Sequence, residues 1–229
     1  MKTLGLLGGM SWESTTSYYQ HLNRLARERL GGQHSAELLM WSVDFAPVSE
    51  MLAGRRWDEI AAILIDAAVK LEAAGAEGLL ICSNTMHLLA PRIAGAVSIP
   101  LLHVVDATSA AVQAVGASRP VLLATRFTME EPFYAEKLAS EGLAPVIPPV
   151  SDRARLHAII FDELVQGRFE EASRREVAAI AARAVGNGAD SVILGCTEFA
   201  LLVGEAHFTV PMFDTTALHA RAAMDFALS

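Results

Sequence analysis

The chain has 229 residues, 52% of them hydrophobic and 19% charged, so we expect a soluble globular protein with one large domain or two lobes, and not a disordered chain. The formal net charge is −8 and no Lys/Arg run opposes it, which argues against a nucleic-acid partner. No apolar run approaches the roughly 18 residues that cross a membrane, and the Gly-rich N-terminal segment does not resemble a signal peptide, so no membrane partner and a cytoplasmic location are expected.

Apolar, strand-like runs alternate along the chain with stretches of helical periodicity. In chain order, we predict strands over residues 3–7, 38–43, 78–81, 101–105, 121–124, 192–194 and 210–213. Helices are predicted over residues 12–30, 57–73, 106–115, 130–140, 153–166, 170–185 and 215–228. This alternation is typical of an α/β fold with mostly parallel sheets.

One internal similarity indicates two related halves. Residues 75–85 and 188–198 each run from a Gly-Ala-acid turn through an apolar strand to a Cys and a Thr-containing turn. We therefore predict two pseudo-symmetric α/β lobes, each a mostly parallel sheet flanked by helices, with the active site in the cleft between them. The first lobe is predicted to comprise residues 1–100 plus 212–229 and to carry Cys82, and the second to comprise residues 101–211 and to carry Cys196.

Cys82 and Cys196 are the only cysteines, and their spacing fits neither a zinc site nor a CxxC redox site. Lone thiols in a reducing compartment are usually small buried hydrophobic groups. Each thiol here, however, directly follows an apolar run at the end of a predicted strand, where parallel α/β sheets bind ligands. A helix starting after each would stabilise a thiolate. Two thiols facing one substrate suit removal of a proton from one face of a carbon and its return to the other.

Other motifs have simpler interpretations. The Gly-rich segment over residues 5–9 lacks the spacing of a dinucleotide-binding turn, and bulky Met10 and Trp12 follow it. His87 and His219 are more simply structural, and Asp214 is more simply the N-cap of the final helix. No Lys lies in a recognisable Schiff-base setting and no metal-ligand cluster is present in the sequence, so neither an organic cofactor nor a metal is expected.

Several sequence blocks carry a family resemblance. They are the segments 8–15 (GGMSWEST), 82–87 (CSNTMH), 125–129 (TRFTM), 195–198 (GCTE) and 214–219 (DTTALH). Together they resemble the aspartate/glutamate racemase family over nearly the whole chain. The resemblance implies two pseudo-symmetric α/β lobes, racemisation of an amino acid without pyridoxal phosphate, and a homodimer. It also implies that Cys82 and Cys196 are the catalytic pair.

The resemblance further suggests which side chains hold the substrate. Met10 and Ser11 would line the site from the first strand–helix turn, and Asn84 and Thr85 would donate to the α-carboxylate. Glu198 would accept from the α-ammonium. From the second lobe, the remaining contacts would come from Thr125, Thr128, Gln166 and Thr197. Such contacts hold the Cα–H bond between the thiols and stabilise a developing carbanion.

Related chemistries remain as alternatives. Hydantoin racemases, maleate isomerases and arylmalonate decarboxylases resemble this family, and maleate isomerisation would use a cysteine as a nucleophile. A catalytically silent amino-acid-binding protein is a third possibility, which the presence of both thiols disfavours. Amino acids with neutral side chains should be accepted as substrates. By the resemblance, acid-specific relatives carry a cation at the position that Gln166 occupies in this chain.

Overall fold

The computed structural model describes all residues, 1–229, and divides the chain into two compact units. Unit 1 comprises Met1–His103 together with His219–Ser229, and unit 2 comprises Val104–Leu218. The chain therefore leaves unit 1, completes unit 2 and returns. No helix is both long enough and apolar enough to cross a membrane.

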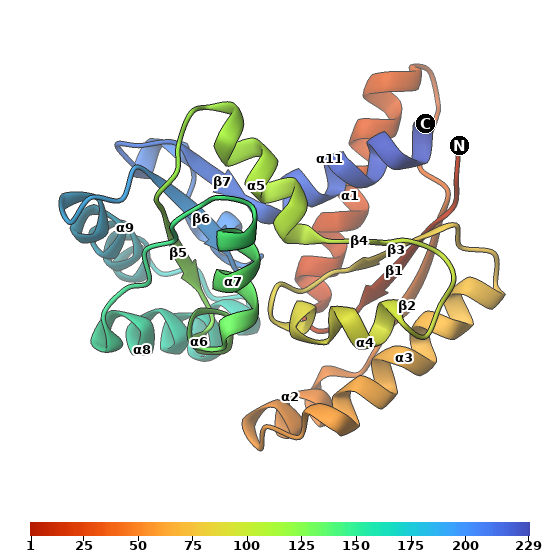
Figure 1. The fold of residues 1–229 in the computed structure, drawn as a ribbon, viewed down its shortest axis with the longest axis horizontal. Helices are drawn as coiled ribbons and strands as arrows, with labels where there is room; N and C mark the ends of the chain where they lie inside the picture. The colour runs from red at the N-terminus through yellow and green to blue at the C-terminus, as the bar shows by residue number, and fades with distance from the viewer. The chain divides into compact units, whose positions relative to one another are not determined.

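Unit 1 is built on a four-stranded parallel sheet with the strand order β2-β1-β3-β4 (Figure 1). Its strands are β1 (Leu4–Gly8), β2 (Leu38–Ser42), β3 (Gly78–Ile81) and β4 (Leu101–Leu102). Its helices are α1 (Trp12–Leu30), α2 (Phe45–Ala53), α3 (Trp57–Ala73), the 3-10 helix η1 (Thr85–Leu89), α4 (Ala90–Ala94) and most of α11 (Thr215–Leu228). β1 and β3 are buried throughout, as expected for apolar runs covered by helices on both faces.

Helices α1 and α11 cover one face of this sheet and α3 covers the other (Figure 1). On the α1 side, Leu4, Leu6 and Leu80 form a core with Tyr18 and Leu22. The residues that α11 adds to this core are Ala220, Ala223, Met224 and Ala227. The opposite face is approached closely by α3, since a Cβ at Gly5 would lie 3.4 Å from Leu71. The helices packed on both faces of the sheet hold the carboxyl ends of β1 and β3 in place.

Unit 2 is built on a three-stranded parallel sheet with the order β5-β6-β7. Its strands are β5 (Pro120–Ala124), β6 (Ser191–Gly195) and β7 (Met212–Asp214). Its helices are α5 (Val104–Ala114), α6 (Arg126–Glu130), α7 (Pro132–Ser140), α8 (Val150–Ala158), α9 (Glu171–Gly186) and α10 (Phe199–Leu202), with a π-helical turn η2 (Ile159–Glu163) and the 3-10 turns η3 (Leu164–Gln166) and η4 (Glu205–His207). The units thus share one architecture, a parallel sheet flanked by helices.

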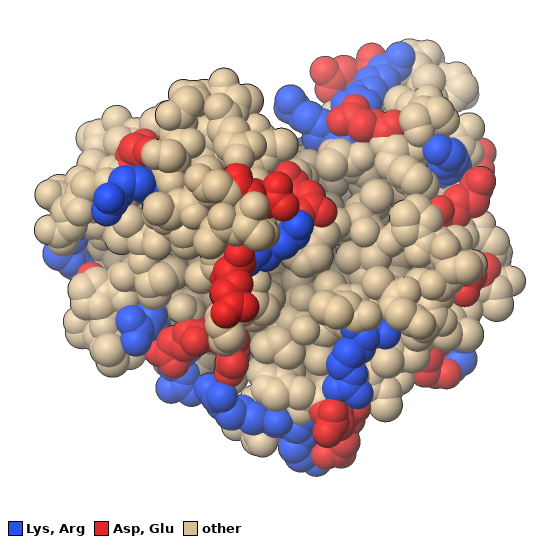
Figure 2. Space-filling model, in the orientation of Figure 1, with Lys and Arg blue, Asp and Glu red and all other residues tan.

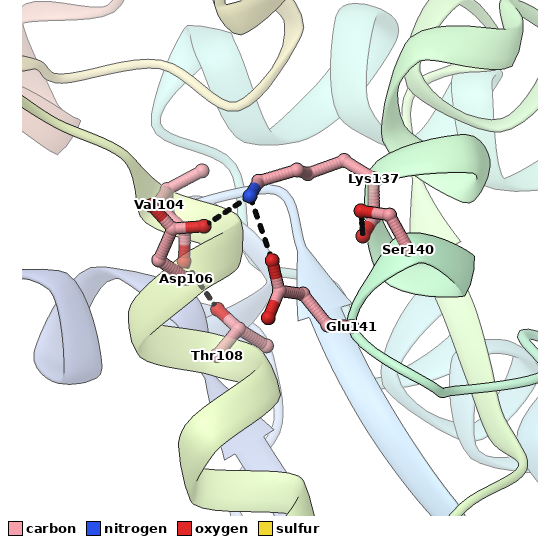
Figure 3. A network of polar contacts seen from close by, with 6 residues as sticks. All are labelled: Val104, Asp106, Thr108, Lys137, Ser140 and Glu141. Carbon is pink, nitrogen blue, oxygen red and sulfur yellow. Dashed lines mark hydrogen bonds and ion pairs between the residues drawn. The ribbon is translucent and has the colours of Figure 1, made fainter.

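A charged network joins two helices of unit 2 (Figure 3). Lys137 of α7 lies 2.6 Å from Asp106 of α5 and 2.8 Å from Glu141, which follows α7. Both carboxylates raise the pKa of Lys137. Over the face drawn in Figure 2, basic side chains are interspersed with acidic ones and form no continuous stripe.

The structure corrects several predicted elements. The predicted helix 130–140 is two helices, because Pro132 starts α7 and holds Glu131 in an extended conformation. The strand predicted over 101–105 ends at Leu102, and α5 begins at Val104. Residues 45–53, for which no helix or strand was predicted, form α2. β7 pairs with β6 and lies in unit 2, whereas residues 212–218 were assigned to the first lobe.

Candidate active site

In unit 1, Cys82 lies at the carboxyl end of β3, a central strand of its sheet. Its backbone N–H donates to Leu7 O of β1 at 2.9 Å, and only 1% of the residue is exposed. Because β1 and β3 are parallel, with Leu7 beside Ile81, the residues that follow β1 emerge at the same edge. Met10 and Ser11 therefore lie at the end of the sheet that carries Cys82, and both are buried.

The turn after β1 is fixed by small polar side chains. Ser11 is the N-cap of α1 and accepts from the backbone N–H of Ser14 at 3.2 Å, and its own hydroxyl donates to Glu13 at 3.1 Å. Thr15 Oγ1 accepts from Gly9 N at 2.9 Å. Asn84 and Thr85, on the Cys82 turn, are also buried. This edge of unit 1 therefore concentrates uncharged polar groups that suit recognition of a carboxylate.

Behind the Cys82 turn lie three histidines and a tyrosine. His87 donates from Nδ1 to Ser83 O at 2.8 Å, and its ring centroid lies 4.6 Å from that of His103 and 5.7 Å from that of His219. His219 Nε2 lies 2.7 Å from Leu102 O and must donate to it, so a neutral His219 accepts from Tyr18 OH at 2.9 Å through Nδ1. Burial, and then the two neighbouring histidines, lower the pKa of His87 well below its ordinary value.

This cluster is a structural support for the peptide after Cys82. The sequence interpretation of His87 and His219 as structural residues agrees with their burial and their bonds to backbone carbonyls. The sequence alone did not identify Tyr18 and His103 as members of this cluster. The available signal was weak: His103 directly follows the short strand β4, which brings it to the same sheet edge as Cys82.

In unit 2, Cys196 lies in the equivalent position at the carboxyl end of β6, again a central strand, and is 5% exposed. Ala124 of β5 is beside Gly195, so Thr125 emerges next to Cys196. Thr125 is the N-cap of α6 and accepts from Thr128 N at 3.2 Å, and the two hydroxyls lie 3.1 Å apart. Cys196 and these threonines thus share one edge of unit 2.

Glu198 binds directly to the second thiol. Its buried carboxylate accepts from Cys196 Sγ and from Thr197 Oγ1, both at 2.9 Å and both at Oε2. The sequence predicted that Glu198 would accept from the substrate ammonium. It did not predict the hydrogen bond from the thiol of Cys196 to this carboxylate. The spacing of two residues between Cys196 and Glu198 was the sequence signal for it.

Gln166 lies farther out on unit 2 than the other predicted site residues. It ends the 3-10 turn η3 and is exposed, and its Nε2 donates to Phe161 O at 3.4 Å. Gly167, which follows, has a left-handed conformation with φ 71°. Arg168 donates to the backbone carbonyl of Asp162.

The expected stabilisation of thiolates by following helices is overridden in this state. Cys82 is followed by a 3-10 helix and Cys196 by the one-turn α10. Burial raises the pKa of Cys82 well above the ordinary thiol value. Burial also raises the pKa of Cys196, and the negative charge and hydrogen bond of Glu198 raise it further, against a smaller lowering by the backbone N–H groups of Glu198 and Phe199. Both thiols are therefore protonated near neutral pH.

No group of three or more His, Cys, Asp and Glu side chains in the chain is arranged to hold a metal ion.

Comparison with known proteins connects this geometry to a family. The family model described as Asp/Glu/Hydantoin racemase matches residues 7–223. The structure is similar to that of a Yersinia pestis protein described as a putative Asp/Glu racemase, with 43% identity, a TM-score of 0.93 and full coverage of both chains. An aspartate racemase homologue from Pyrococcus horikoshii is 31% identical, with a TM-score of 0.87 and full coverage of both chains.

Among curated proteins, the Bacillus subtilis "Broad specificity amino-acid racemase RacX" is 24% identical over 99% of this chain and 98% of its own length. The match to the family model covers both units and both cysteine turns. The chain therefore belongs to the Asp/Glu/hydantoin racemase family, a family of isomerases.

Proposed function

We propose that this chain interconverts the L and D enantiomers of amino acids, without a cofactor, by proton transfer between Cys82 and Cys196. The observation that carries the proposal is the matched pair of thiols. Each lies at the carboxyl end of a central parallel strand, is buried and is accompanied by small uncharged donors. Ligands of parallel α/β sheets bind at such strand ends.

The proposed reaction needs one thiolate and one thiol. The thiolate removes the Cα proton and becomes a thiol, and the electron pair of the broken C–H bond stays on the substrate, delocalised into its carboxylate. The opposite thiol then gives its proton to the other face of Cα and becomes the thiolate. After one turnover the two cysteines have exchanged roles, so the same pair catalyses the reverse direction.

Glu198 is proposed to generate the first thiolate. Its Oε2 accepts from Cys196 Sγ at 2.9 Å, within the range for a general base. Transfer of the thiol proton to this carboxylate leaves a neutral Glu198 and a Cys196 thiolate. The charge that opposes ionisation of the thiol is thereby removed at the same moment.

The proposed substrates are free amino acids, with neutral side chains tolerated. The name of the B. subtilis relative, a broad-specificity amino-acid racemase that aligns with the whole chain, supports a range wider than aspartate and glutamate. Asn84 and Thr85 in unit 1 and Thr125, Thr128 and Thr197 in unit 2 are proposed donors to the substrate carboxylate, with Met10 and Ser11 lining the site.

The test uses Cys82→Ser and Cys196→Ser in D₂O. Each variant should lose racemisation, yet each should still exchange the Cα proton for deuterium in only one enantiomer, and the two variants should differ in which one. Proton NMR follows exchange, and chiral chromatography follows inversion. Near wild-type racemisation by either variant contradicts the two-thiol mechanism. Parallel assays with hydantoins and maleate test the alternative reactions, and a wild-type chain that binds amino acids without exchanging Cα–H contradicts the enzyme proposal.

A further inference from the structure

The carbonyl oxygen of Ser83, one residue after Cys82, is bonded by a side chain. His87 Nδ1 lies 2.8 Å from Ser83 O. A carbonyl oxygen only accepts hydrogen bonds, so Nδ1 carries the proton and donates it. The backbone N–H of His87, which would bond to Ser83 O in an α-helix, donates to Asn84 O at 3.1 Å instead. The His87 ring therefore holds a carbonyl that the backbone of the 3-10 helix η1 does not.

The His87 ring is itself held in place by the buried cluster around it. It is 2% exposed, and its centroid lies 4.6 Å from the ring of His103 and 5.7 Å from that of His219. His219 is bonded in turn to Tyr18 of α1, at 2.9 Å, and to a backbone carbonyl of β4, at 2.7 Å. The hydrogen bond between His87 and Ser83 therefore runs from the turn into the buried interior of unit 1.

The peptide bond between Ser83 and Asn84 transmits this direction to a donor. The chain has no cis peptide bond, so the C=O and N–H groups of this peptide point in opposite directions. Because Ser83 O points into the cluster, the backbone N–H of Asn84 points out of it. Asn84 is also one of the residues that we propose as donors to the substrate carboxylate. The bond that His87 makes on one side of the peptide thus fixes the donor on the other side.

The cluster orients this turn without supplying charge. Burial, and then the neighbouring His103 and His219, lower the pKa of His87 well below its ordinary value, so the ring is neutral near neutral pH. The raised pKa of Cys82 is due to burial, with no contribution from these histidines. A neutral donor that bonds to a backbone carbonyl acts through geometry. A different neutral side chain that donates from the same place should therefore replace it.

We propose that His87 is a positioning residue, whose hydrogen bond to Ser83 O aims the backbone N–H of Asn84 at the carboxylate of the bound amino acid. This inference rests on the proposed racemisation. The electron pair of the broken Cα–H bond is delocalised into that carboxylate, so a preset donor gains strength as the negative charge develops. Without the bond to Ser83 the peptide can rotate, and both substrate binding and proton removal become weaker.

The first experiment compares His87→Asn with His87→Leu, two side chains of similar size. The amide nitrogen of Asn is bonded to Cγ, as Nδ1 of His is, so it can donate to Ser83 O, whereas Leu cannot. His87→Asn should keep KM and kcat within about threefold of wild type. His87→Leu should lose at least about 10-fold in kcat/KM, part of it as a higher KM. A smaller folded fraction would lower kcat alone.

Stability should follow the opposite order. Leu suits the buried position left by the ring, whereas Asn buries an additional polar group, so the urea midpoint should be lower for His87→Asn than for His87→Leu. The less stable variant is thus expected to be the more active one. Tyr18→Phe is the control, because it removes the bond to His219 and leaves the bond to Ser83 intact. It should lower the urea midpoint without raising KM.

The second experiment uses the wild-type chain and so does not depend on the folding of a variant. In amide NMR spectra of the ¹⁵N-labelled protein, saturating methionine should shift the Asn84 resonance. An Asn84 amide that stays unchanged while other amides of the site shift overturns the proposal. So does wild-type KM and kcat in His87→Leu, or activity that follows the stability of the two His87 variants. If the wild-type chain exchanges no Cα–H at all, the proposed function fails as well, whereas an active wild type with an unaffected His87→Leu removes the positioning role alone.

Discussion

Glu198 has two opposite effects on the thiol it binds, and they can be separated. As a carboxylate it raises the pKa of Cys196 by charge and by hydrogen bonding. As a proton acceptor 2.9 Å from Sγ, it is the proposed route to the thiolate. Glu198 therefore keeps the thiol of Cys196 protonated as long as its own carboxylate is charged. Once the thiol proton has moved to the carboxylate, this opposition to the thiolate is gone.

Glu198→Gln should therefore change reactivity and catalysis in opposite directions. The amide keeps the shape but removes the charge, so the pKa of Cys196 should fall, and alkylation of this thiol should occur at lower pH. Racemisation should fall by about 10²–10⁴-fold, the range for loss of a general base. The measurements are the pH dependence of iodoacetamide labelling, located by mass spectrometry, and kcat/KM. The exposed Glu205→Gln is the control and should alter neither.

Substrate range is a second property of single residues. The family resemblance places Gln166, a neutral amide, where acid-specific relatives would carry a cation, and we propose that a substrate carboxylate bound there would have no cationic partner. A buried carboxylate without a paired cation costs several kcal/mol. We therefore expect kcat/KM for homoserine, methionine or glutamine to match or exceed that for aspartate and glutamate. If an acidic substrate exceeds every neutral one by more than about 100-fold, or about 2.7 kcal/mol, another residue must supply a cation.

At the scale of elements, the turn from β1 into α1 positions Met10 and Ser11 and depends on one glycine. Gly9 has φ 87°, and a Cβ there would lie 2.2 Å from Val43 O and 2.4 Å from Val43 N. Neither atom can move without displacing the chain that follows β2. The turn therefore requires glycine both for its conformation and for the close approach of the backbone.

Gly9→Ala should destabilise the protein by more than about 3 kcal/mol or prevent folding, because backbone strain and a backbone clash act together. Gly116→Ala is the matched control: its φ is 75°, but nothing lies within 4 Å of the added Cβ. The free energy of unfolding of Gly116→Ala should be only about 1 kcal/mol below that of wild type. Urea denaturation of both variants gives the comparison, and equal losses would contradict the importance of the Val43 contact.

Periodicity predicted the long elements well and the short ones poorly. Residues 57–73 and 215–228 have the predicted bounds, since apolar spacing extends over several turns. α2 was missed because nine residues containing Pro47 resemble a loop. The strands predicted over 78–81 and 192–194 placed both thiols at strand ends, although the second strand runs one residue further, to Gly195. The bonds of Glu198 to Cys196, and of Tyr18 to His219 over 201 positions, depend on side-chain directions that spacing does not specify.

At the scale of the whole molecule, the two buried thiols couple stability to alkaline pH. Burial raises the pKa of Cys82, and burial with Glu198 raises that of Cys196. Below the thiol pKa of the unfolded chain, about 8.5, both states hold the protons and this contribution to stability is fully present. Above it, the unfolded chain loses thiol protons that the folded chain retains, so stability falls as pH rises.

The free energy of unfolding should therefore decrease between pH ~8 and ~10, with each thiol contributing up to about 1.4 kcal/mol per pH unit above its unfolded pKa. Cys82→Ser should make this decrease shallower. Urea titrations of both proteins across this range measure the effect. If the free energy of unfolding falls with pH equally steeply in wild type and in Cys82→Ser, groups other than this thiol control the loss of stability at alkaline pH.

The insertion of unit 2 within unit 1 has a consequence for synthesis on the ribosome. Residues 1–103 emerge first, but the face formed by Leu4, Tyr18 and Leu22 is completed by Ala220, Ala223 and Met224 of α11. These are translated only after all of unit 2. Unit 2 is one continuous stretch of 115 residues, Val104–Leu218, and contains all of its own sheet. During translation, residues 1–103 therefore expose this apolar face until α11 has been synthesised, and a chaperone would bind them in this interval.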